Sequence, residues 1–318
     1  MRGIFIINPS SGKQINQPKA IQAATELLRD GVVDEITFFY TKVKDDAKNR
    51  TIQACKENYD FIVAAGGDGT VNEVVAGLYI SGSKMPMAIM PCGTSNDFAT
   101  SVGITPTVLS LYSLIKDFNI ISTDIGRFND TDYFLNVAAG GVLSDVAHSV
   151  SVESKTLLGK TAYITSGLKT IAEKGFKTTR LLFEIDGVKE EIDVYFFVIA
   201  NSKSVGGFPR ICYDAKINDG YMDLCIVKSL DFLSAVPVFT AVLDGTHMYN
   251  KNVDYRQVRD VKIFALNEED TVFHLDCDGE YAGELPMHVE VLRGGINLLL
   301  PTESDKTKRI VAEPETSN

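Results

Sequence analysis

The sequence predicts an α/β protein with an N-terminal doubly wound parallel-sheet domain and a C-terminal β-sandwich domain. Up to residue 122, short apolar strands alternate with helical segments, and the strands end in polar turns that contain glycine. From residue 123 on, helical periods become rare and short strands follow one another, separated by turns. We therefore expect domains at residues 1–122 and 123–295, a strand at 296–300 that returns to the first domain, and a polar tail at 301–318.

Strands and helices are expected to alternate in the first domain. The strands are Gly3–Ile7, Glu35–Tyr40, Phe61–Ala65 and Met87–Met90. One helix has Ile21, Ala24 and Leu28 on one face and Gly31 at its end, and a second helix is expected at Asp46–Asn58. The strands expected in the second domain are Tyr133–Ala138, Arg180–Ile185, Val194–Ala200, Met222–Val227, Val261–Ala265, Val272–Asp276 and His288–Leu292. Asp186-Gly187 is a hairpin signal between two of them.

The most informative stretch directly follows the apolar strand Phe61–Ala65. Its residues are Gly66, Gly67, Asp68, Gly69 and Thr70, and a helical pattern starts at Asn72-Glu73. Glycines let backbone N–H groups approach a phosphate, and the helix dipole favours negative charge there. An aspartate would repel the phosphate, so it suits Mg²⁺ or a metal-bound water beside it. A strand-to-helix turn without a ligand is the alternative, and the added aspartate and Asn-Glu pair favour the phosphate site.

Similar turns follow two other strands of the first domain. One is Asn8-Pro9-Ser10-Ser11-Gly12-Lys13, and the other is Pro91-Cys92-Gly93-Thr94-Ser95-Asn96-Asp97-Phe98. The lysine at the end of the first turn suits a phosphate or a solvated loop charge equally well. The carboxyl ends of parallel strands share one edge of the sheet, where open α/β sheets bind ligands. We therefore expect all three turns to meet there.

The overall composition excludes several classes of function. A net charge of −11 argues against broad nucleic-acid binding and against a uniformly basic membrane face. The five cysteines show no CxxC spacing and the four histidines are dispersed, so a zinc site is not expected. The apolar runs are too short to span a bilayer, and no targeting signal is visible. A reducing, cytoplasmic compartment fits this pattern.

One segment has the opposite charge to the rest of the chain. Residues Lys155–Arg180 carry six lysines and arginines against Glu173 alone, an excess of 6 − 1 = 5 positive charges, with apolar residues at helical spacing. An amphipathic basic helix suits peripheral contact with an anionic membrane surface. A helix docked on its own domain with solvated lysines is the alternative.

Two acidic turns stand out in the second domain. Lys216-Ile217-Asn218-Asp219-Gly220-Tyr221 offers a carboxylate and backbone carbonyls to a hard cation, and is equally typical of a plain turn between strands. Asp278-Gly279-Glu280 places two carboxylates around one glycine at a strand end. Such a pair suits a general base that removes a hydroxyl proton near a metal, and hairpin turns have the same composition.

Taken together, these motifs resemble one family. The ordered series of the turns at 8–13, 66–73, 93–98 and 278–280, with Thr123-Asp124-Ile125-Gly126, is similar to the diacylglycerol kinase catalytic-domain superfamily, which includes sphingosine and ceramide kinases. The likeness is closest to the soluble bacterial diacylglycerol kinases and bacterial lipid kinases, and it extends from Ile4 to Leu300. It implies a first domain like that of phosphofructokinase and NAD kinase.

The resemblance also implies roles for individual residues. ATP would be bound by Asn8, Ser10, Ser11, Gly12, Thr41, Gly66, Gly67, Asp68, Gly69, Thr70, Asn72, Glu73, Gly93 and Thr94. Catalytic Mg²⁺ and its waters would be organised by Asp68, Asp97 and Asp124, and a structural Mg²⁺ by the Asp219 carboxylate with the carbonyls of Lys216 and Tyr221. Glu280 or Asp278 would be the catalytic base.

The activity implied is transfer of the γ-phosphate of ATP to a lipid hydroxyl, giving phosphatidic acid if the acceptor is diacylglycerol. Phosphatidylglycerol, long-chain bases and isoprenoid alcohols remain alternative acceptors, and a catalytically silent nucleotide- or lipid-binding protein is the alternative from another class. The protein would work at the inner face of the membrane, and the resemblance also allows a homodimer. NAD kinase and phosphofructokinase share the glycine turn, but phosphofructokinase needs an acidic Thr-Ile-Asp-Asn-Asp-like run that this chain lacks.

Overall fold

The computed structural model describes residues 1–12, 16–141, 178–206, 210–228, 238, 241, 245–267, 270 and 273–302. The chain divides into two compact units. Unit 1 is Met1–Thr123 with Ile296–Asn318, and unit 2 is Asp124–Gly295. The predicted fold class is confirmed, because unit 1 is built on a parallel sheet with helices and the regular elements described in unit 2 are almost all β-strands.

Unit 1 contains the parallel sheet. Its strands are β1 (Arg2–Ile7), β2 (Glu35–Tyr40), β3 (Phe61–Gly66) and β4 (Met87–Pro91), in the order β4-β3-β1-β2. The last residues of β15 (Met287–Leu299) add a parallel neighbour to β4 through Leu298 and Met87, where the sequence predicted a returning strand. Every residue of β3 and β4 is buried, which explains their uninterrupted apolar sequence. The strand order changes direction between β1 and β3, so the carboxyl ends of these two strands form the switch point at which such sheets bind ligands.

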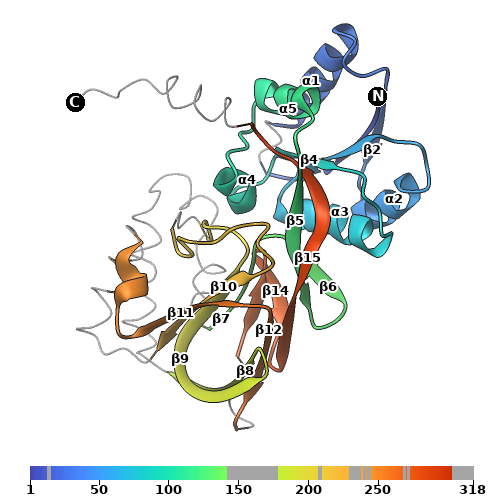
Figure 1. Cartoon of the computed structure of the whole chain (residues 1–318). Coiled ribbons are helices and arrows are strands. Elements are labelled where there is room, and N and C mark those ends of the chain that lie inside the picture. The colour runs from blue at the N-terminus through green and yellow to red at the C-terminus, as the bar shows by residue number, and fades with distance from the viewer. Residues whose placement is uncertain are drawn as a thin grey trace, which may run out of the picture. The chain divides into compact units, whose positions relative to one another are not determined.

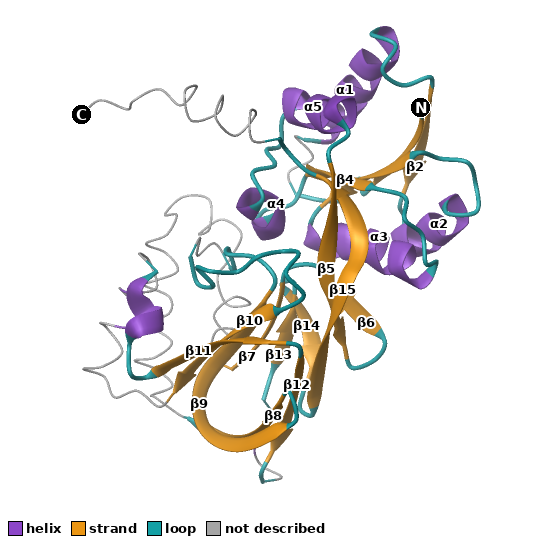
Figure 2. Ribbon diagram, in the orientation of Figure 1, coloured by secondary structure: helices purple, strands orange, loops and turns teal. Residues whose placement is uncertain are grey.

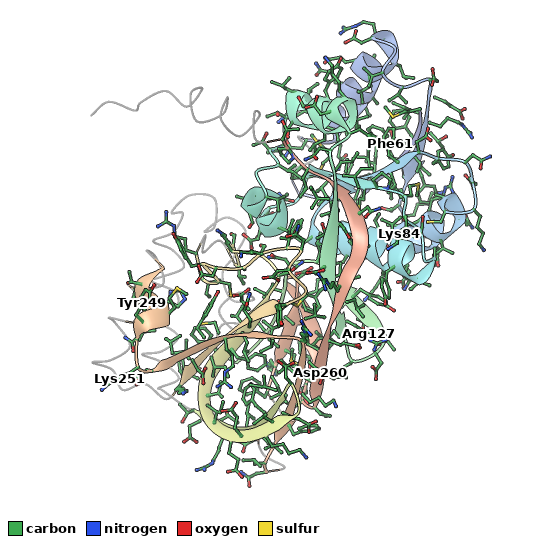
Figure 3. The ribbon with its side chains drawn as sticks, viewed as in Figure 1. Phe61, Lys84, Arg127, Tyr249, Lys251 and Asp260 are labelled. Atoms are coloured by element: carbon green, nitrogen blue, oxygen red, sulfur yellow. The ribbon has the colours of Figure 1, made fainter. Side chains whose placement is uncertain are left out.

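Helices cover both faces of this sheet (Figure 2). Helices α1 (Gln17–Arg29) and α5 (Val108–Asp117) lie together on one face, and α2 (Asp46–Ala54) and α3 (Asp68–Ile80) on the other, while the short α4 (Asp97–Ser101) follows β4. The ring of Phe61, labelled in Figure 3, packs under Gly3 of β1. A Cβ on Gly3 would lie 2.2 Å from that ring, so the sheet core needs a glycine there.

The apolar face predicted for α1 is buried only in part. The buried residues are Ala20, Ala23, Ala24 and Leu27, whereas Ile21 and Leu28 are about 40% exposed. The helix carries two overlapping apolar stripes, and the stripe of three alanines buries because small side chains allow the helix axis to approach the sheet closely. The predicted end at Gly31 is confirmed: this glycine has a φ of +70°, and the N–H groups of Gly31 and Val32 donate to Leu28 and Leu27.

Unit 2 is built from antiparallel strands (Figure 1). Those described are β5 (Ile120–Phe128, which begins in unit 1), β6 (Asp132–Phe134), β7 (Val137–Gly141), β8 (Thr179–Ile185), β9 (Val188–Ala200), β10 (Met222–Lys228), β11 (Val253–Val258), β12 (Asp260–Ala265), β13 (Leu275–Cys277), β14 (Glu280–Gly283) and most of β15. They pair in the order β14-β13-β7-β9-β8-β12-β15, with β10 joining β9 to β11 and β5 joining β15 to β6. A 3₁₀ turn at Thr246–Tyr249 precedes β11.

The long strand β9 separates two apolar clusters. Phe197 and Ile199 pack into one, and Phe196, Val198 and Ala200 into the other. This alternation buries both faces of β9, one in each apolar cluster. The predicted Asp186-Gly187 hairpin is confirmed, because Ile185 pairs with Val188 across it. The predicted start of β9 at Val194 is wrong by six residues, since the polar residues before it continue the hairpin in register with β8.

Several predictions fall outside the described residues. Lys13 and the basic segment up to residue 177 are among them, and so is Val272 at the start of a predicted strand. Arg180, the last residue of the basic segment, is described, and it lies in β8 with an ion pair to Glu191. Among the helices that the structure describes, none is long and apolar enough to cross a membrane.

Candidate active site

The three glycine-containing turns of unit 1 meet at the carboxyl edge of the sheet. The Asn8 amide donates to the Thr70 hydroxyl at 3.0 Å, which joins the turn after β1 to the start of α3. The Ser11 hydroxyl accepts the Gly67 N–H at 3.2 Å. The Asp68 carboxylate accepts the Asn96 N–H at 3.2 Å, which adds the turn after β4. The meeting of the turns expected from strand order is therefore present in the structure.

Glycine is required where these turns touch. A Cβ on Gly93 would lie 2.7 Å from the Cα of Gly67, and a Cβ on Gly12 would lie 2.2 Å from the carbonyl oxygen of Cys92. Gly12 also has a φ of +57°, which L-residues rarely adopt. Gly66 is equally constrained, since a Cβ there would lie 2.4 Å from the side chain of Thr70. The turns thus approach one another backbone to backbone at this edge.

Asn8 organises the first of these turns. Its side-chain oxygen accepts the N–H and the hydroxyl of Ser10, at 3.0 and 2.7 Å, while its amide donates to Thr70. The third turn is closed by Asn96, which the sequence did not single out. With a φ of +48°, Asn96 accepts the Gly93 N–H at 3.0 Å and donates to the Gly93 carbonyl at 2.7 Å. Thr94 is exposed within that turn.

Helix α3 begins where the ATP-binding residues were predicted. Gly67 is its N-cap with extended backbone, and Asp68 is its first residue, followed by Gly69 and Thr70. The first N–H groups of a helix have no carbonyl partner within the helix, so they favour an anion. The side-chain oxygen of Asn72 is buried and has no hydrogen-bond partner among the described residues, which leaves one acceptor for a ligand or water. Asp97 is the first residue of α4, on the neighbouring turn.

Glu73 and Thr41 lie beside this edge with structural contacts. The two carboxylate oxygens of Glu73 accept the N–H groups of Asp45 and Ala47, at 2.9 and 3.0 Å, so Glu73 caps α2 from the neighbouring helix. Thr41 is buried at the end of β2, and its N–H donates to Ile7 of β1 at 2.9 Å. The sequence placed both residues at the nucleotide, which stays a prediction, and the contacts in the structure fix the segment between β2 and α2.

In unit 2, the two carboxylates of the acidic turn have opposite environments. Asp278 is 9% exposed, and its carboxylate accepts the N–H groups of Leu135, Asn136 and Val137, at 3.0, 3.2 and 2.6 Å. Glu280 is exposed at the start of β14. A carboxylate held by three backbone donors is poorly suited to accept a substrate proton, because protonation would break charge-assisted hydrogen bonds. The exposed glutamate has no such restraint.

Two further residues shape this turn. The Asp276 carboxylate accepts the Gly279 N–H at 2.8 Å, which closes the turn, and the sequence did not assign this residue a role. Burial, more than the neighbouring carboxylates of Asp278 and Asp276, raises the pKa of the Cys277 thiol well above its usual range. The Cys277 side chain is partly buried against the apolar cluster of unit 2, which favours the neutral thiol.

Asp124 is buried and anchors the turn at 216–221. Its two oxygens accept the N–H groups of Gly220 and Gly294, at 2.6 and 2.7 Å. Its own N–H donates to Ile217 at 2.7 Å. Asp124 therefore fixes the turn that carries the predicted structural metal ligands, and its role in a catalytic Mg²⁺ network stays a prediction.

The turn at 216–221 offers only oxygen ligands. Among the described residues, no three His, Cys, Asp or Glu side chains gather as a metal site, so a cation here would need main-chain ligands. Asp219 supplies one carboxylate, whose oxygens accept the Tyr221 N–H and the Gln257 amide, each at 3.0 Å. The carbonyls of Lys216 and Tyr221 would complete a hard oxygen set, which fits Mg²⁺ by donor chemistry.

Comparison with known proteins supports a single family. A model described as "Diacylglycerol kinase catalytic domain" matches residues 2–128, and one described as "YegS C-terminal NAD kinase beta sandwich-like domain" matches residues 136–300. A Bacillus subtilis protein named "Diacylglycerol kinase" is 32% identical over 303 residues, covering 95% of this chain and 97% of that relative. A Staphylococcus carnosus protein of the same name is 29% identical, covering 97% of this chain and 98% of the relative.

Solved structures agree with this result. The crystal structure of a putative diacylglycerol kinase from Bacillus anthracis has a TM-score of 0.76 and 25% identity, covering 94% of this chain and 95% of that one. An NAD kinase from Archaeoglobus fulgidus has a TM-score of 0.51 at 13% identity, covering 98% of this chain and 97% of its own, and shares the fold alone. The resemblance deduced from the motifs is confirmed over residues 2–128 and 136–300: this protein belongs to the diacylglycerol kinase family.

Proposed function

We propose that the protein is an ATP-dependent lipid kinase that transfers the γ-phosphate of ATP to the free hydroxyl of diacylglycerol, forming phosphatidic acid. Membership of the diacylglycerol kinase family supports ATP-dependent phosphorylation of a lipid. The observation that carries the proposal is the contrast between the two carboxylates of the acidic turn: Asp278 is bound by main-chain donors, whereas Glu280 is exposed. The relatives named above as diacylglycerol kinases support the choice of acceptor.

Unit 1 would hold the triphosphate of ATP. The turns at 8–12, 66–70 and 92–96 present main-chain amides at close range, because glycines occupy their points of contact. The start of α3 adds the positive end of a helix dipole. These groups are fixed before the nucleotide arrives, so they would hold the phosphates in line for transfer without reorganisation.

Unit 2 would supply the base. The carboxylate of Glu280 would accept the proton of the lipid hydroxyl as its oxygen attacks the γ-phosphorus and the bond to the β–γ bridging oxygen breaks. Asp278 would act on this step only through position, by holding the turn against residues 135–137. The environments of the two carboxylates therefore support Glu280 over Asp278 as the base.

Magnesium is part of the proposal through donor chemistry. Asp68 and Asp97 would hold the Mg²⁺ that accompanies ATP, and Asp219 with the carbonyls of Lys216 and Tyr221 would hold a structural ion. A divalent cation at the phosphates would offset the charge that develops on the bridging and terminal oxygens.

Radiolabelled phosphate transfer tests the proposal. The purified protein is incubated with γ-labelled ATP, Mg²⁺ and mixed micelles containing one acceptor at a time: diacylglycerol, phosphatidylglycerol, a long-chain base or an isoprenoid alcohol. We expect labelled phosphatidic acid as the main product. Preferred labelling of another alcohol would replace the acceptor, and a folded protein that labels none of them would overturn the proposal.

A matched pair of variants makes the assay specific to the assigned base. Glu280→Gln removes the carboxylate and keeps the side-chain volume, so we expect labelling to be lost. Glu284→Gln changes another exposed glutamate four residues further along the chain, and we expect it to retain activity. Equal effects of the two changes would contradict the role of Glu280.

A further inference from the structure

We propose that Asn201 is a positioning residue that couples the turn at 216–221 to the acidic turn at 278–280 through a continuous buried hydrogen-bond network. The inference rests on the proposed function in one respect, the assignment of Glu280 as the base. All of the contacts that carry it lie within unit 2.

Asn201 stands between the two segments that hold these turns. It is 0% exposed and follows the last residue of β9. Its side-chain amide donates to the carbonyl of Asp124 at 2.7 Å and to the carbonyl of Leu135 at 2.9 Å. Its main-chain N–H donates to the carbonyl of Asn136 at 2.8 Å. One residue therefore binds both the strand that contains Asp124 and the segment at 135–137.

On one side the network leads to the acidic turn. Residues 135–137 direct three consecutive N–H groups at the Asp278 carboxylate. The Asn136 side chain is itself fixed, because its oxygen accepts the Ser202 hydroxyl at 2.5 Å and its amide donates to the Ser204 carbonyl at 3.0 Å. Any shift of this segment would move the carboxylate it holds and, two residues later, Glu280.

On the other side the network leads to the turn at 216–221. The residue whose carbonyl Asn201 binds is Asp124, which holds Gly220 through its carboxylate and Ile217 through its N–H. From Gly220 to Asp278 the path thus passes only through hydrogen bonds of buried groups: Asp124, Asn201 and the segment at 135–137. Buried polar networks of this kind have few alternative arrangements, because each lost bond leaves an unpaired group away from water.

The chemistry explains why an asparagine is needed. The two amide hydrogens face two carbonyl oxygens, which a flipped amide, a carboxylate or a single hydroxyl could not satisfy together. This orientation leaves the side-chain oxygen buried without a hydrogen-bond partner among the described residues. An orientation kept despite an unpaired acceptor indicates that the two donated bonds dominate.

The test compares Asn201→Asp with Ser202→Ala and with Ile263→Ala as a control. Asn201→Asp keeps the side-chain shape and removes both donors, while Ser202→Ala removes only the bond to Asn136. Ile263→Ala opens a hole in the apolar cluster of unit 2, away from the network, and lowers stability without touching a polar contact. If Asn201→Asp fails to fold, the milder Ser202→Ala decides the question.

Two readouts are required. Hydrogen exchange followed by mass spectrometry needs neither ATP nor lipid, and it reports the main-chain amides that the network protects. We expect Asn201→Asp to accelerate exchange in peptides spanning 132–138 and 216–222, and Ser202→Ala to do so in the first of these. In the kinase assay we expect kcat to fall by about tenfold to a hundredfold with the KM for ATP nearly unchanged, because the base is displaced and the nucleotide turns are not.

The control separates positioning from general stability. Ile263→Ala should lower the melting temperature with little change in exchange at 132–138 and 216–222 or in kcat. If exchange and kcat in all three variants change only in proportion to the loss of melting temperature, Asn201 is merely structural and the proposal is wrong. If the wild-type protein labels no lipid, the proposed function fails, while the exchange experiment still decides whether the two turns are coupled.

Discussion

Replacing Asp278 by asparagine should destabilise the protein strongly, although the change is nearly isosteric. The carboxylate accepts three main-chain N–H groups, from Leu135, Asn136 and Val137. An asparagine keeps one acceptor oxygen and turns its NH₂ group towards donors, so one or two of these bonds are lost. Hydrogen bonds to a charged group contribute about 1.5–3 kcal/mol each, so we expect a loss of about 3 kcal/mol in the free energy of unfolding.

This loss is large enough to measure directly. For a unit of this size, 1 kcal/mol corresponds to about 2–4 °C in melting temperature, so Asp278→Asn should melt about 6–12 °C below the wild type. Glu280→Gln should melt with the wild type, because the side chain is exposed. Its phosphate transfer should nevertheless fall by about 10²–10⁴-fold, the usual contribution of a general base.

Thermal unfolding followed by circular dichroism, together with labelled phosphate transfer well below both melting temperatures, separates the two carboxylates. The reasoning predicts a stability defect at Asp278 and a catalytic defect at Glu280. The opposite result would refute it: an Asp278→Asn protein with wild-type melting and no transfer, beside an active Glu280→Gln protein, would make Asp278 the base.

Three more predictions concern the edge of the parallel sheet in unit 1. Asp68→Asn should abolish transfer with a small change in melting temperature, since the amide oxygen of asparagine can still accept the Asn96 N–H, and undiminished turnover would exclude the metal role of Asp68. Glu73→Gln should lower the free energy of unfolding by about 0.5–2 kcal/mol, because it loses one of the two hydrogen bonds that cap α2. Denaturant unfolding measures this loss, and an unchanged midpoint would contradict the contact. Gly93→Ala should weaken ATP binding in calorimetry, because the new Cβ would force the turn away from Gly67, and wild-type affinity would argue against close contact of the turns.

Much of unit 1 could be predicted because strand order determines its geometry. Buried parallel strands are recognisable as short apolar runs, and their carboxyl ends must share one edge, so the meeting of the turns at 8–12, 66–70 and 92–96 followed from order alone. The contacts within that edge did not follow. Nothing local marks Asn96 as the residue that closes its turn, or Glu73 as the cap of a helix that begins 27 residues earlier.

The same limit applies to unit 2. The side chains of Asn201, Asp124 and Asp278 form hydrogen bonds with segments between 66 and 170 residues away in the chain. Their composition is that of ordinary polar turn residues, and period-2 alternation predicts which strand residues are buried without predicting where a buried polar side chain finds its partner. The sequence therefore identifies the acidic turn but does not show which of its two carboxylates is the better candidate for the base.

A second Asp-Gly turn in the same unit shows why the ranking comes out as it does. Asp186-Gly187 and Asp278-Gly279 both have positive φ values at the two central residues, as two-residue hairpins require. In both turns the aspartate accepts main-chain N–H groups of a neighbouring segment: Asp186 holds residues 259 and 260, and Asp278 holds residues 135–137. In both of these turns the aspartate therefore fixes a neighbouring segment. Because Cys277 pairs with Glu280 across the second turn, Glu280 belongs to the strand that leaves the turn and does not hold a neighbouring segment as the aspartate does. What distinguishes the acidic turn from its counterpart is therefore the glutamate that follows the glycine, where the other turn has Val188, and that glutamate is where proton transfer should be sought.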